Sequence, residues 1–280
     1  MNNNAQNMLI VTDLDGSLLD HYTYSFAPAK TLIEELVAGG IPVVPCSSKT
    51  RAEISVLRTK LGLEHCPYVV ENGAAIYLPQ RFYANPGEER VGADWRHAFG
   101  KNRSHWQDVL LTLPDELRAN YRKFSKMTVG QIADLTGLSL EDAALAAKRE
   151  FGEPIHWRGS VEAKQALIDA LAEKGAHVLQ GGRFLHVAGE WDKGRALNWL
   201  ADYLTPQPGD RPVTVALGDS HNDVAMLEAA DYAVIIRSPV HGAPEVLREG
   251  PTIYTTQTGP KGWVEGVREV LKQCRGMAIG

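Results

Sequence analysis

The sequence has little of what marks disulfide scaffolds, membrane proteins and nucleic-acid-binding proteins. Only three cysteines occur in 280 residues. An odd number of cysteines without framework spacing is typical of a reducing compartment, so we expect a cytoplasmic location. No apolar run approaches the roughly 18 residues of a membrane span. The polar start MNNNAQN has no basic residue before its short apolar run, so we expect no secretory signal.

Basic residues are also too few for a broad nucleic-acid-binding surface, because 29 Lys and Arg face 34 Asp and Glu, for a net charge of −5. No pair of histidines has the spacing His-Glu-x-x-His of a metalloprotease. The hydrophobic fraction of 44% excludes a disordered protein, and the length suits one large or two modest domains. We expect no nucleic-acid or membrane partner, and no protein partner is evident.

Short apolar runs alternate with helical patterns in two parts of the chain, which predicts a mostly parallel sheet covered on both faces. The pattern between them, from about residue 81 to 188, is α+β-like, so we expect a parallel-sheet core interrupted by an inserted domain. The expected core strands are 8–12, 41–45, 68–70, 75–78, 213–217 and 232–236, with helices 28–39, 50–61, 193–204, 222–230 and 260–273. In the insert we expect helices 104–113, 128–150 (broken at 136–139) and 160–174, and strands 154–157, 176–180 and 183–188.

Polar side chains follow four of the expected core strands. Because ligands of open parallel sheets bind at the carboxyl ends of the strands, these groups are candidates for one site. Each cluster alone has an ordinary explanation, as a turn or as a helix cap. Capping needs one side chain, however, whereas the last cluster offers three. The clusters are Asp13 and Asp15, Ser47 to Lys49, Glu71 and Asn72, and Asp219, Asn222 and Asp223.

Four segments of the chain resemble, in order, the motifs of the haloacid dehalogenase superfamily of phosphatases, and three of them are strand-end clusters. The four segments are DLDGSLL at 13–19, Ser47, Lys193 within DKGRAL, and GDSHND at 218–223. The resemblance, to the Cof-type branch, implies a Rossmann-like α/β core over residues 1–82 and 189–280, with an inserted α+β cap over 83–188 that sets specificity. Many relatives have Thr-Gly-Arg where this chain has Ser47-Ser48-Lys49, but serine can still donate the same hydrogen bond.

Further segments are similar to the mannosyl-3-phosphoglycerate phosphatases of that branch. They are CSSKTRAE (46–53), ENGAAIYLP (71–79), the insert stretch 127–155, and GGRFLH (181–186). This resemblance implies that the substrate is a small phosphorylated sugar or glycoside, mannosyl-3-phosphoglycerate, and that the products are mannosylglycerate and phosphate.

The residue types suit phosphoryl transfer. A carboxylate can form an acyl phosphate, so Asp13 is the candidate nucleophile. Asp15, two residues on, would share its face in an extended chain and could act as general acid and then base. Ser47 can donate a hydrogen bond to the phosphoryl oxygens, and Lys193 offers them a point charge. For Ser47 the ordinary alternative is a strand-end turn, and for Lys193 a solvated helix start.

The carboxylates expected at the ends of the core strands also suit a hard cation. Mg²⁺ takes oxygen ligands and offsets charge on the phosphoryl group, so we expect Asp13 and Asp219 to bind it. The resemblance adds the backbone carbonyl of Asp15 as a third protein ligand. Asn222 and Asp223 are expected to orient Lys193 or the waters of the metal.

Substrate contacts are expected at Lys49, Glu71, Asn72, Arg183 and His186. Arg183 suits the carboxylate of a glycerate, because a guanidinium can bind a carboxylate with two hydrogen bonds. The alternatives are a turn before Gly73 for Glu71 and Asn72, and an ordinary exposed strand arginine for Arg183.

Other functions stay open at this point. The same chemistry could serve another sugar phosphate, such as glucosyl-3-phosphoglycerate, or a phosphomutase, which would not release inorganic phosphate. A phospho-acceptor signalling domain also uses a strand-end aspartate with Mg²⁺ and a lysine. Such a domain would hold its phosphate stably, and it needs neither Asp15 nor a large insert.

Overall fold

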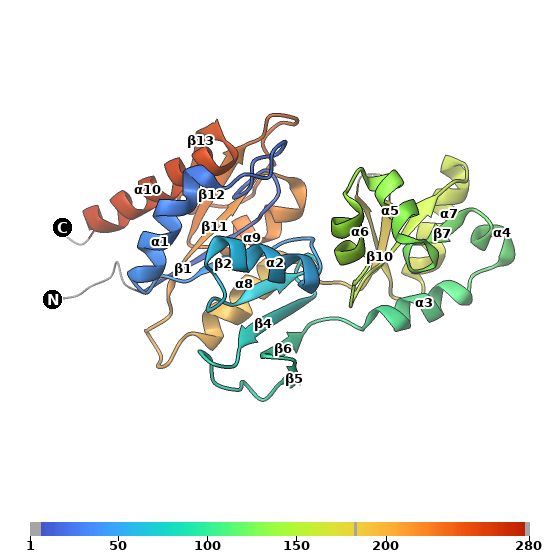
Figure 1. Ribbon diagram of the computed structural model, residues 1–280, viewed down its shortest axis with the longest axis horizontal. Coiled ribbons are helices and arrows are strands. Elements are labelled where there is room, and N and C mark those ends of the chain that lie inside the picture. The colour runs from blue at the N-terminus through green and yellow to red at the C-terminus, as the bar shows by residue number, and fades with distance from the viewer. Residues whose placement is uncertain (1–6, 182–183, 278–280) are drawn as a thin grey trace. The chain divides into compact units, whose positions relative to one another are not determined.

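The computed structural model describes residues 7–181 and 184–277, and its chain divides into two compact units (Figure 1). Unit 1 contains the chain up to residue 48, residues 56–97, and the chain from residue 192 onward. Unit 2 contains residues 49–55 and 98–191. The chain therefore leaves unit 1 later than the sequence-based boundary at 82, because two strands after that point pair into a sheet of unit 1.

The core of unit 1 is a five-stranded sheet in the order β13-β12-β11-β1-β2, in which every neighbouring pair is parallel. Its central strands are buried on both faces and consist mainly of apolar residues, as expected for a covered parallel sheet. The predicted α/β fold class, with a parallel core and additional antiparallel sheets, is confirmed. The strands are β1 (Met8–Thr12), β2 (Val43–Pro45), β11 (Val213–Gly218), β12 (Tyr232–Arg237) and β13 (Thr252–Thr258).

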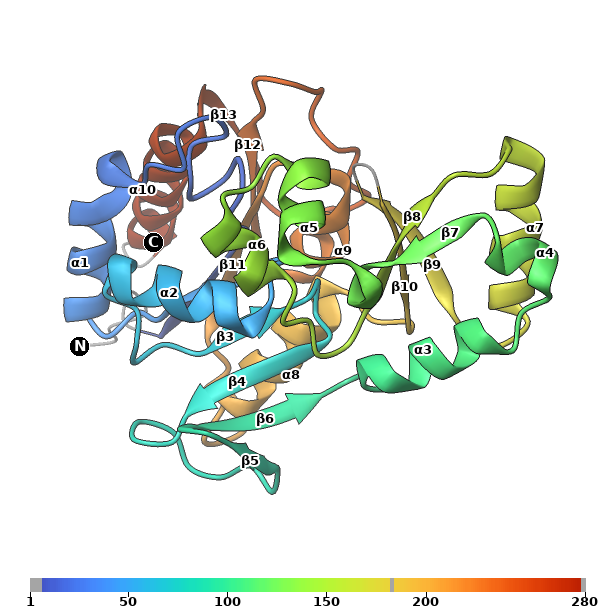
Figure 2. The same cartoon turned by 45° about the vertical axis from the view of Figure 1, so that its right-hand side comes forward.

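Helices cover both faces of this sheet. Figure 2 shows α1 and α10 on one side and α8 and α9 on the other. Helix α1 buries Leu32, Ile33 and Leu36 at the spacing of one helical face, which explains why it packs on the sheet. The helices of this part are η1 (Ala27–Ala29), α1 (Lys30–Ala38), α2 (Arg51–Leu61), α8 (Lys193–Tyr203), η3 (His221–Asp223), α9 (Val224–Ala229) and α10 (Gly259–Met277).

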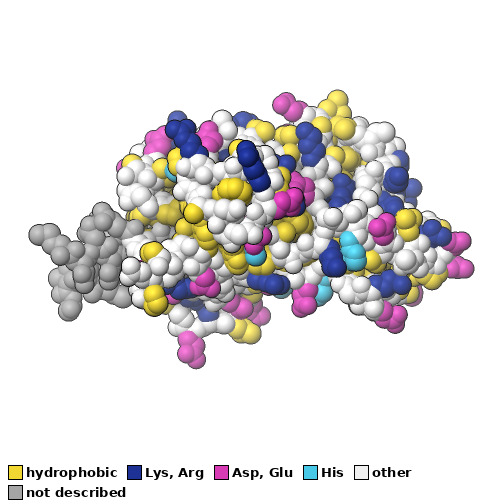
Figure 3. Space-filling model, turned by 90° about the horizontal axis from the view of Figure 1, so that it is seen from below, with side chains coloured by type: hydrophobic (Ala, Val, Ile, Leu, Met, Phe, Trp, Pro, Cys, Tyr) yellow, Lys and Arg dark blue, Asp and Glu magenta, His cyan; other side chains and the backbone are white. Residues whose placement is uncertain are grey.

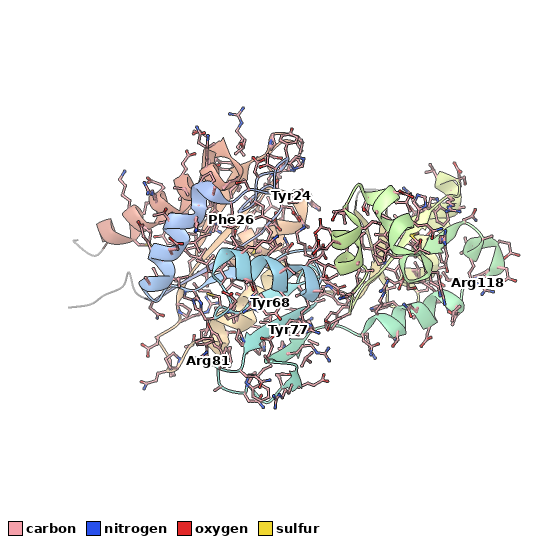
Figure 4. The ribbon with its side chains drawn as sticks, viewed as in Figure 1. Tyr24, Phe26, Tyr68, Tyr77, Arg81 and Arg118 are labelled. Carbon is pink, nitrogen blue, oxygen red and sulfur yellow. The ribbon has the colours of Figure 1, made fainter. Side chains whose placement is uncertain are left out.

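A second sheet of unit 1 has the order β3-β4-β6-β5. Its first hairpin buries Tyr68 and Tyr77, whose rings stack at 5.1 Å (Figure 4). The hydroxyl of Tyr68 donates to the Asp94 carboxylate at 2.7 Å, which ties the third strand to the first. The strands are β3 (Tyr68–Val70), β4 (Ala75–Pro79), β5 (Glu89–Val91) and β6 (Asp94–Ala98).

Unit 2 is an α+β structure with an antiparallel sheet in the order β7-β8-β10-β9. Four of its helices start at a side-chain cap, from Asn102, Thr128, Ser139 and Ser160. The expected break at 136–139 separates α5 from α6, because Gly137 adopts a left-handed conformation and Ser139 caps the next helix. The elements are α3 (Arg103–Leu111), α4 (Asp115–Arg118), β7 (Tyr121–Lys123), η2 (Phe124–Lys126), α5 (Val129–Thr136), α6 (Leu140–Ala146), β8 (Glu153–Trp157), α7 (Val161–Ala172), β9 (His177–Gly181) and β10 (Phe184–Ala188).

The sequence did not predict the edge strand β13 or the strands β5, β6 and β7. Strand β13 is mostly polar, and Thr255 is its one buried residue, so no apolar run signals it. The short strands β5 and β7 are exposed or half-buried, which removes the same signal. Edge strands of this kind are stabilised by pairing with a neighbour more than by their own burial.

In the described part of the chain, no helix has both the length and the apolar character to cross a membrane.

Acidic and basic side chains are interspersed on the face shown in Figure 3.

Candidate active site

The loops that follow four strands of unit 1 are hydrogen-bonded to one another. The amide of Asp13 donates to the carbonyl of Leu217 at 2.8 Å, which joins the ends of β1 and β11. The amide of Asn72 donates to the carbonyl of Ser47 at 2.9 Å, which joins the ends of β2 and β3. The four clusters that the sequence placed at strand ends therefore lie at one edge of the sheet, as expected from the parallel arrangement.

Three buried carboxylates meet at this edge. Asp13, Asp219 and Asp223 each offer an oxygen, and these oxygens lie within 4.8 Å of one another. The ammonium of Lys193 lies 2.6 Å from Asp13 Oδ1 and 2.6 Å from Asp223 Oδ1, and the lysine side chain is fully buried. One buried cation thus faces three carboxylates.

The charges in this cluster raise the pKa values of its members. Burial raises the pKa of Asp13 well above its ordinary value, and the charge of Asp223 adds to the rise. Burial and then Asp223 raise the pKa of Asp219 to about 6. Burial alone would lower the pKa of Lys193, but Asp13 and Asp223 outweigh it and raise that pKa. Burial is thus the largest cause of the raised pKa of both aspartates, repulsion by Asp223 adds to it, and the carboxylates of Asp13 and Asp223 favour the charged form of Lys193.

Lys193 is held in place by the start of α8. Asp192 caps this helix by accepting a hydrogen bond from the Arg195 amide at 2.7 Å. Gly73 lies directly against this point, since a Cβ there would come within 2.1 Å of the Asp192 carbonyl oxygen. Gly73 also has a φ of +98°, which other residues rarely adopt. The turn after β3 therefore packs against the helix end that carries Lys193 only because residue 73 is glycine.

Asp223 organises the loop after β11. Its Oδ2 accepts hydrogen bonds from the amides of Asp219 and Ser220, both at 3.1 Å, while its Oδ1 accepts from Lys193. A Cβ on Gly218 would come within 2.5 Å of the Asp223 side chain, so glycine is required for this close packing. Both oxygens of Asp223 are thus engaged with protein groups, which leaves Asp13 and Asp219 as the better candidates for binding a ligand.

The loop after β1 packs against Asp219. Gly16 has a φ of +80°, and a Cβ there would come within 2.6 Å of Asp219 Oδ2. The buried Ser17 hydroxyl donates to Asp219 Oδ1 at 3.4 Å. Ser17 was not among the predicted site residues, although it lies within the first motif. Asp15 lies in the same turn, half-buried, two residues from Asp13.

The predicted residues after β3 also belong to this edge. Glu71 is buried, and Glu71 and Asn72 have φ values of 49° and 61°. Two successive non-glycine residues in the left-handed region are uncommon and carry a conformational cost, which is typical of functional turns. The side-chain Nδ2 of Asn222 donates to Asn72 Oδ1 at 3.1 Å, so the loops after β3 and β11 are joined through two predicted residues.

The other three predicted substrate residues are not part of the described residues of unit 1. Lys49 belongs to unit 2, as does His186, which lies on β10 of that unit. Burial, with a contribution from the charge of Arg149, lowers the pKa of His186 to about 3, so this side chain is neutral at physiological pH. Arg183 lies outside the described residues. Substrate contacts by these three residues stay predictions.

His241 is a neighbour of the carboxylates that the sequence analysis missed. Its Nε2 lies 3.4 Å from Asp219 Oδ2, and it comes from the segment between β12 and β13. The motif pattern ends at Asp223, and an isolated histidine in a polar segment gives no signal of its own.

The donor set of this site fits a divalent cation. Three carboxylates converge, and the single positive charge of Lys193 does not neutralise all of them. The loop that carries Asp15 packs on Asp219 through Gly16. Hard cations such as Mg²⁺ prefer oxygen ligands of this kind. Asp13 and Asp219 of the buried cluster could hold such an ion.

A family model describes the same parts of the chain. The model of the haloacid dehalogenase-like hydrolases matches residues 10–86 and 161–247, which is more than half of the sequence. The chain belongs to this family. Both matched stretches contain the strand-end clusters that form the site.

Solved structures of similar proteins share the fold. A Bacteroides thetaiotaomicron protein, described among phosphatases of the haloalkanoate enzyme superfamily, is 17% identical with a TM-score of 0.65, over 98% of this chain and 97% of its own. A haloacid dehalogenase-like hydrolase from B. subtilis is 18% identical with a TM-score of 0.60, over 94% and 98%. The sucrose-phosphatase of Synechocystis sp. PCC6803, solved with sucrose and phosphate, is 17% identical with a TM-score of 0.55, over 94% and 97%. At identities of 17–18%, these structures show that this hydrolase shares their fold.

Proposed function

We propose that this hydrolase is a Mg²⁺-dependent phosphatase that cleaves mannosyl-3-phosphoglycerate into mannosylglycerate and phosphate. The observation that carries the proposal is the buried cluster in which Lys193 bridges Asp13 and Asp223 while Asp219 stands beside them. Buried carboxylates in excess over cations are costly to fold, so their presence at a ligand-binding edge of the sheet favours a catalytic role.

The proposed first step uses Asp13 as the nucleophile. Its Oδ1 is bound by Lys193, and its other oxygen attacks the phosphorus. The bond between phosphorus and the leaving oxygen breaks, and the phosphoryl group is carried on Asp13 as an acyl phosphate. Lys193 holds Asp13 in one orientation and lends positive charge to the reacting oxygens.

Asp15 is the proposed acid and base. It gives a proton to the departing glycerate oxygen in the first step and takes one from the attacking water in the second. That water breaks the acyl phosphate at phosphorus, which releases phosphate and restores Asp13. Ser47 is the proposed donor to the phosphoryl oxygens. It is fully buried at the end of β2, next to the loop of Asp13.

Mg²⁺, when bound by Asp13, Asp219 and the Asp15 carbonyl, would offset the negative charge of both the cluster and the phosphate ester. Asp223 holds the loop of Asp219 in place, because its Oδ2 accepts hydrogen bonds from the backbone amides of Asp219 and Ser220. We propose that Asn222 and Asp223 act by holding Lys193 and the loops, without direct contact with substrate.

The choice of substrate is supported by sequence segments in both units, above all ENGAAIYLP at 71–79 and the insert stretch 127–155. The sucrose-phosphatase of similar fold was solved with a sugar and phosphate, which supports a sugar-linked phosphate in general. Glucosyl-3-phosphoglycerate is the nearest alternative substrate, because it differs at one sugar carbon only.

The direct test is a phosphate-release screen with Mg²⁺ over a panel of sugar phosphates that includes mannosyl- and glucosyl-3-phosphoglycerate. We expect the highest kcat/KM with mannosyl-3-phosphoglycerate. A higher value with another member of the panel would contradict the substrate assignment. A protein that becomes phosphorylated once and releases nothing would contradict the phosphatase assignment and favour a phospho-acceptor domain.

A further inference from the structure

A polar pocket of about 320 Å³ opens at the end of β12, beside the carboxylate cluster. Gly218 of β11 pairs with Ile235 of β12, so Asp219 and the end of β12 leave neighbouring strands at the same edge. Adjacent strands lie about 4.8 Å apart, so the pocket is one strand away from a proposed metal ligand. Its polar side chains come from Arg237, Ser238, His241, Tyr254 and Thr255.

Arg237 is the cationic group of this pocket. Its backbone amide donates to the Thr255 hydroxyl at 3.0 Å, which fixes the residue at the end of the strand. Its exposed guanidinium donates only one long hydrogen bond, at 3.4 Å, to the carbonyl of Thr256. Within residues 7–181 and 184–277, no carboxylate lies within salt-bridge distance of it. Most of its five donors are therefore available to a ligand, and their planar fork matches an oxyanion.

His241 joins the pocket to the catalytic carboxylates. A carbonyl only accepts, so the contact of Nδ1 with the Gly242 carbonyl at 2.9 Å places a proton on Nδ1 and fixes the ring. The other nitrogen, Nε2, faces Asp219 Oδ2 at 3.4 Å. Ser238 also lines the pocket, and its Oγ accepts a hydrogen bond from the Val240 amide at 3.4 Å, so its own proton is left to donate.

We infer that this pocket binds a carboxylate carried on the leaving group of the substrate, and that Arg237 determines this specificity. The inference rests on the proposed phosphatase function and narrows its substrate class. A phosphate ester whose phosphorus lies at Asp13, after β1, would place the carboxylate of its leaving group past Asp219 of β11 and at the end of β12, two strands along the sheet edge. Phosphate esters whose leaving group carries a second anionic group are then favoured over esters of the same size whose leaving group is uncharged.

Two other assignments compete for this carboxylate or this pocket. The sequence analysis gives the glycerate carboxylate to Arg183 of unit 2, which lies outside the described residues. A free oxyanion, such as the phosphate product, has the same hydrogen-bonding chemistry and could fill the pocket without being part of the substrate. The experiment below separates the three.

The test uses two esters that differ only in the anionic group, 3-phosphoglycerate and glycerol 3-phosphate. Phosphate release with Mg²⁺ gives the ratio of their kcat/KM values for the wild type, Arg237→Gln, Arg183→Gln and Arg268→Gln. Arg268 is the matched control because it is an exposed arginine of α10 in the same unit. A charged hydrogen bond lost from the pocket should lower the ratio in Arg237→Gln by about tenfold to a hundredfold. Arg268→Gln should keep the wild-type ratio.

Calorimetric titration of D-glycerate and of inorganic phosphate into the protein in excess chelator provides a second readout that does not need turnover. Without a cation the three carboxylates repel anions, so binding then reports on the pocket. We expect glycerate to bind at least tenfold more weakly to Arg237→Gln than to Arg268→Gln.

The outcomes separate this inference from the proposed function. If the wild type hydrolyses neither these two esters nor mannosyl-3-phosphoglycerate, the proposed function fails, and the glycerate titration still decides whether the pocket binds a carboxylate. An unchanged ester ratio in Arg237→Gln overturns the inference, and a lowered ratio in Arg183→Gln alone gives the carboxylate to unit 2. Loss of phosphate binding in Arg237→Gln with an unchanged ratio would assign the pocket to a free anion and also overturn the inference.

Discussion

Asp219→Asn should stabilise the metal-free protein. Burial and Asp223 raise the pKa of Asp219 from 3.8 to about 6 in the folded protein. Because the folded state resists ionisation of this group, the cost is absent at low pH, grows as the pH rises above 3.8, and is complete above 6. Each pKa unit is worth about 1.4 kcal/mol, so the ionised carboxylate costs about 3 kcal/mol at pH 7 and only about 0.5 kcal/mol at pH 4.

Urea unfolding at these two pH values, in excess chelator, measures the effect. We expect Asp219→Asn to raise the free energy of unfolding by about 2–3 kcal/mol at pH 7 and by less than about 1 kcal/mol at pH 4. Asp210→Asn is the control, because Asp210 is an exposed aspartate that is not part of the buried carboxylate cluster. Added Mg²⁺ should stabilise the wild type, by about 2.7 kcal/mol at a hundred times its Kd, and should stabilise Asp219→Asn much less. An Asp219→Asn variant that is less stable than the wild type at pH 7 without metal would refute the reasoning.

Further predictions concern the lysine, the cation and the buried histidine. Lys193→Met should lower the free energy of unfolding by about 3–5 kcal/mol, since it leaves two buried carboxylates without their partner, and should abolish phosphate release; urea unfolding at wild-type values would contradict this. Phosphate release should vanish in excess chelator and return with Mg²⁺, whereas full activity in chelator would argue against a cation site. His186 should contribute a loss of stability as the pH falls below 6.5, because its pKa is lowered to about 3 in the folded state; this loss opposes the gain that comes from protonation of Asp219. His186→Gln should remove about 2 kcal/mol of that loss at pH 5, while the exposed control His177→Gln should not.

The sequence predicted the strands that carry the site because each is a short apolar run followed by polar groups. The edge strand β13 and the hairpin β5–β6 gave no such signal, because their stability comes from pairing and their residues are mostly polar or half-buried. The expected end of the core at residue 82 was therefore placed before strands that pair into unit 1.

Within the site, motif spacing led to Asp13, Lys193, Asp219 and Asp223, and the structure brings these four together. Pattern alone did not separate their roles. The two amide hydrogen bonds of Asp223 depend on how the loop turns back after β11, which no spacing rule specifies. His241 was missed for the same reason, because its contact with Asp219 joins segments that share no motif.

The most direct test of the central claim is to trap the phosphorylated protein during turnover and find which residue carries the phosphate. Acyl phosphates are reduced by borohydride, so an acid-quenched reaction treated with borohydride should convert aspartate 13 into homoserine, detected by peptide mass spectrometry. We predict this change at Asp13 with substrate and Mg²⁺, and its absence in Asp13→Asn and in the sample without substrate. Reduction at another residue, or steady phosphate release by Asp13→Asn that mass spectrometry shows to be free of deamidation, would contradict the account.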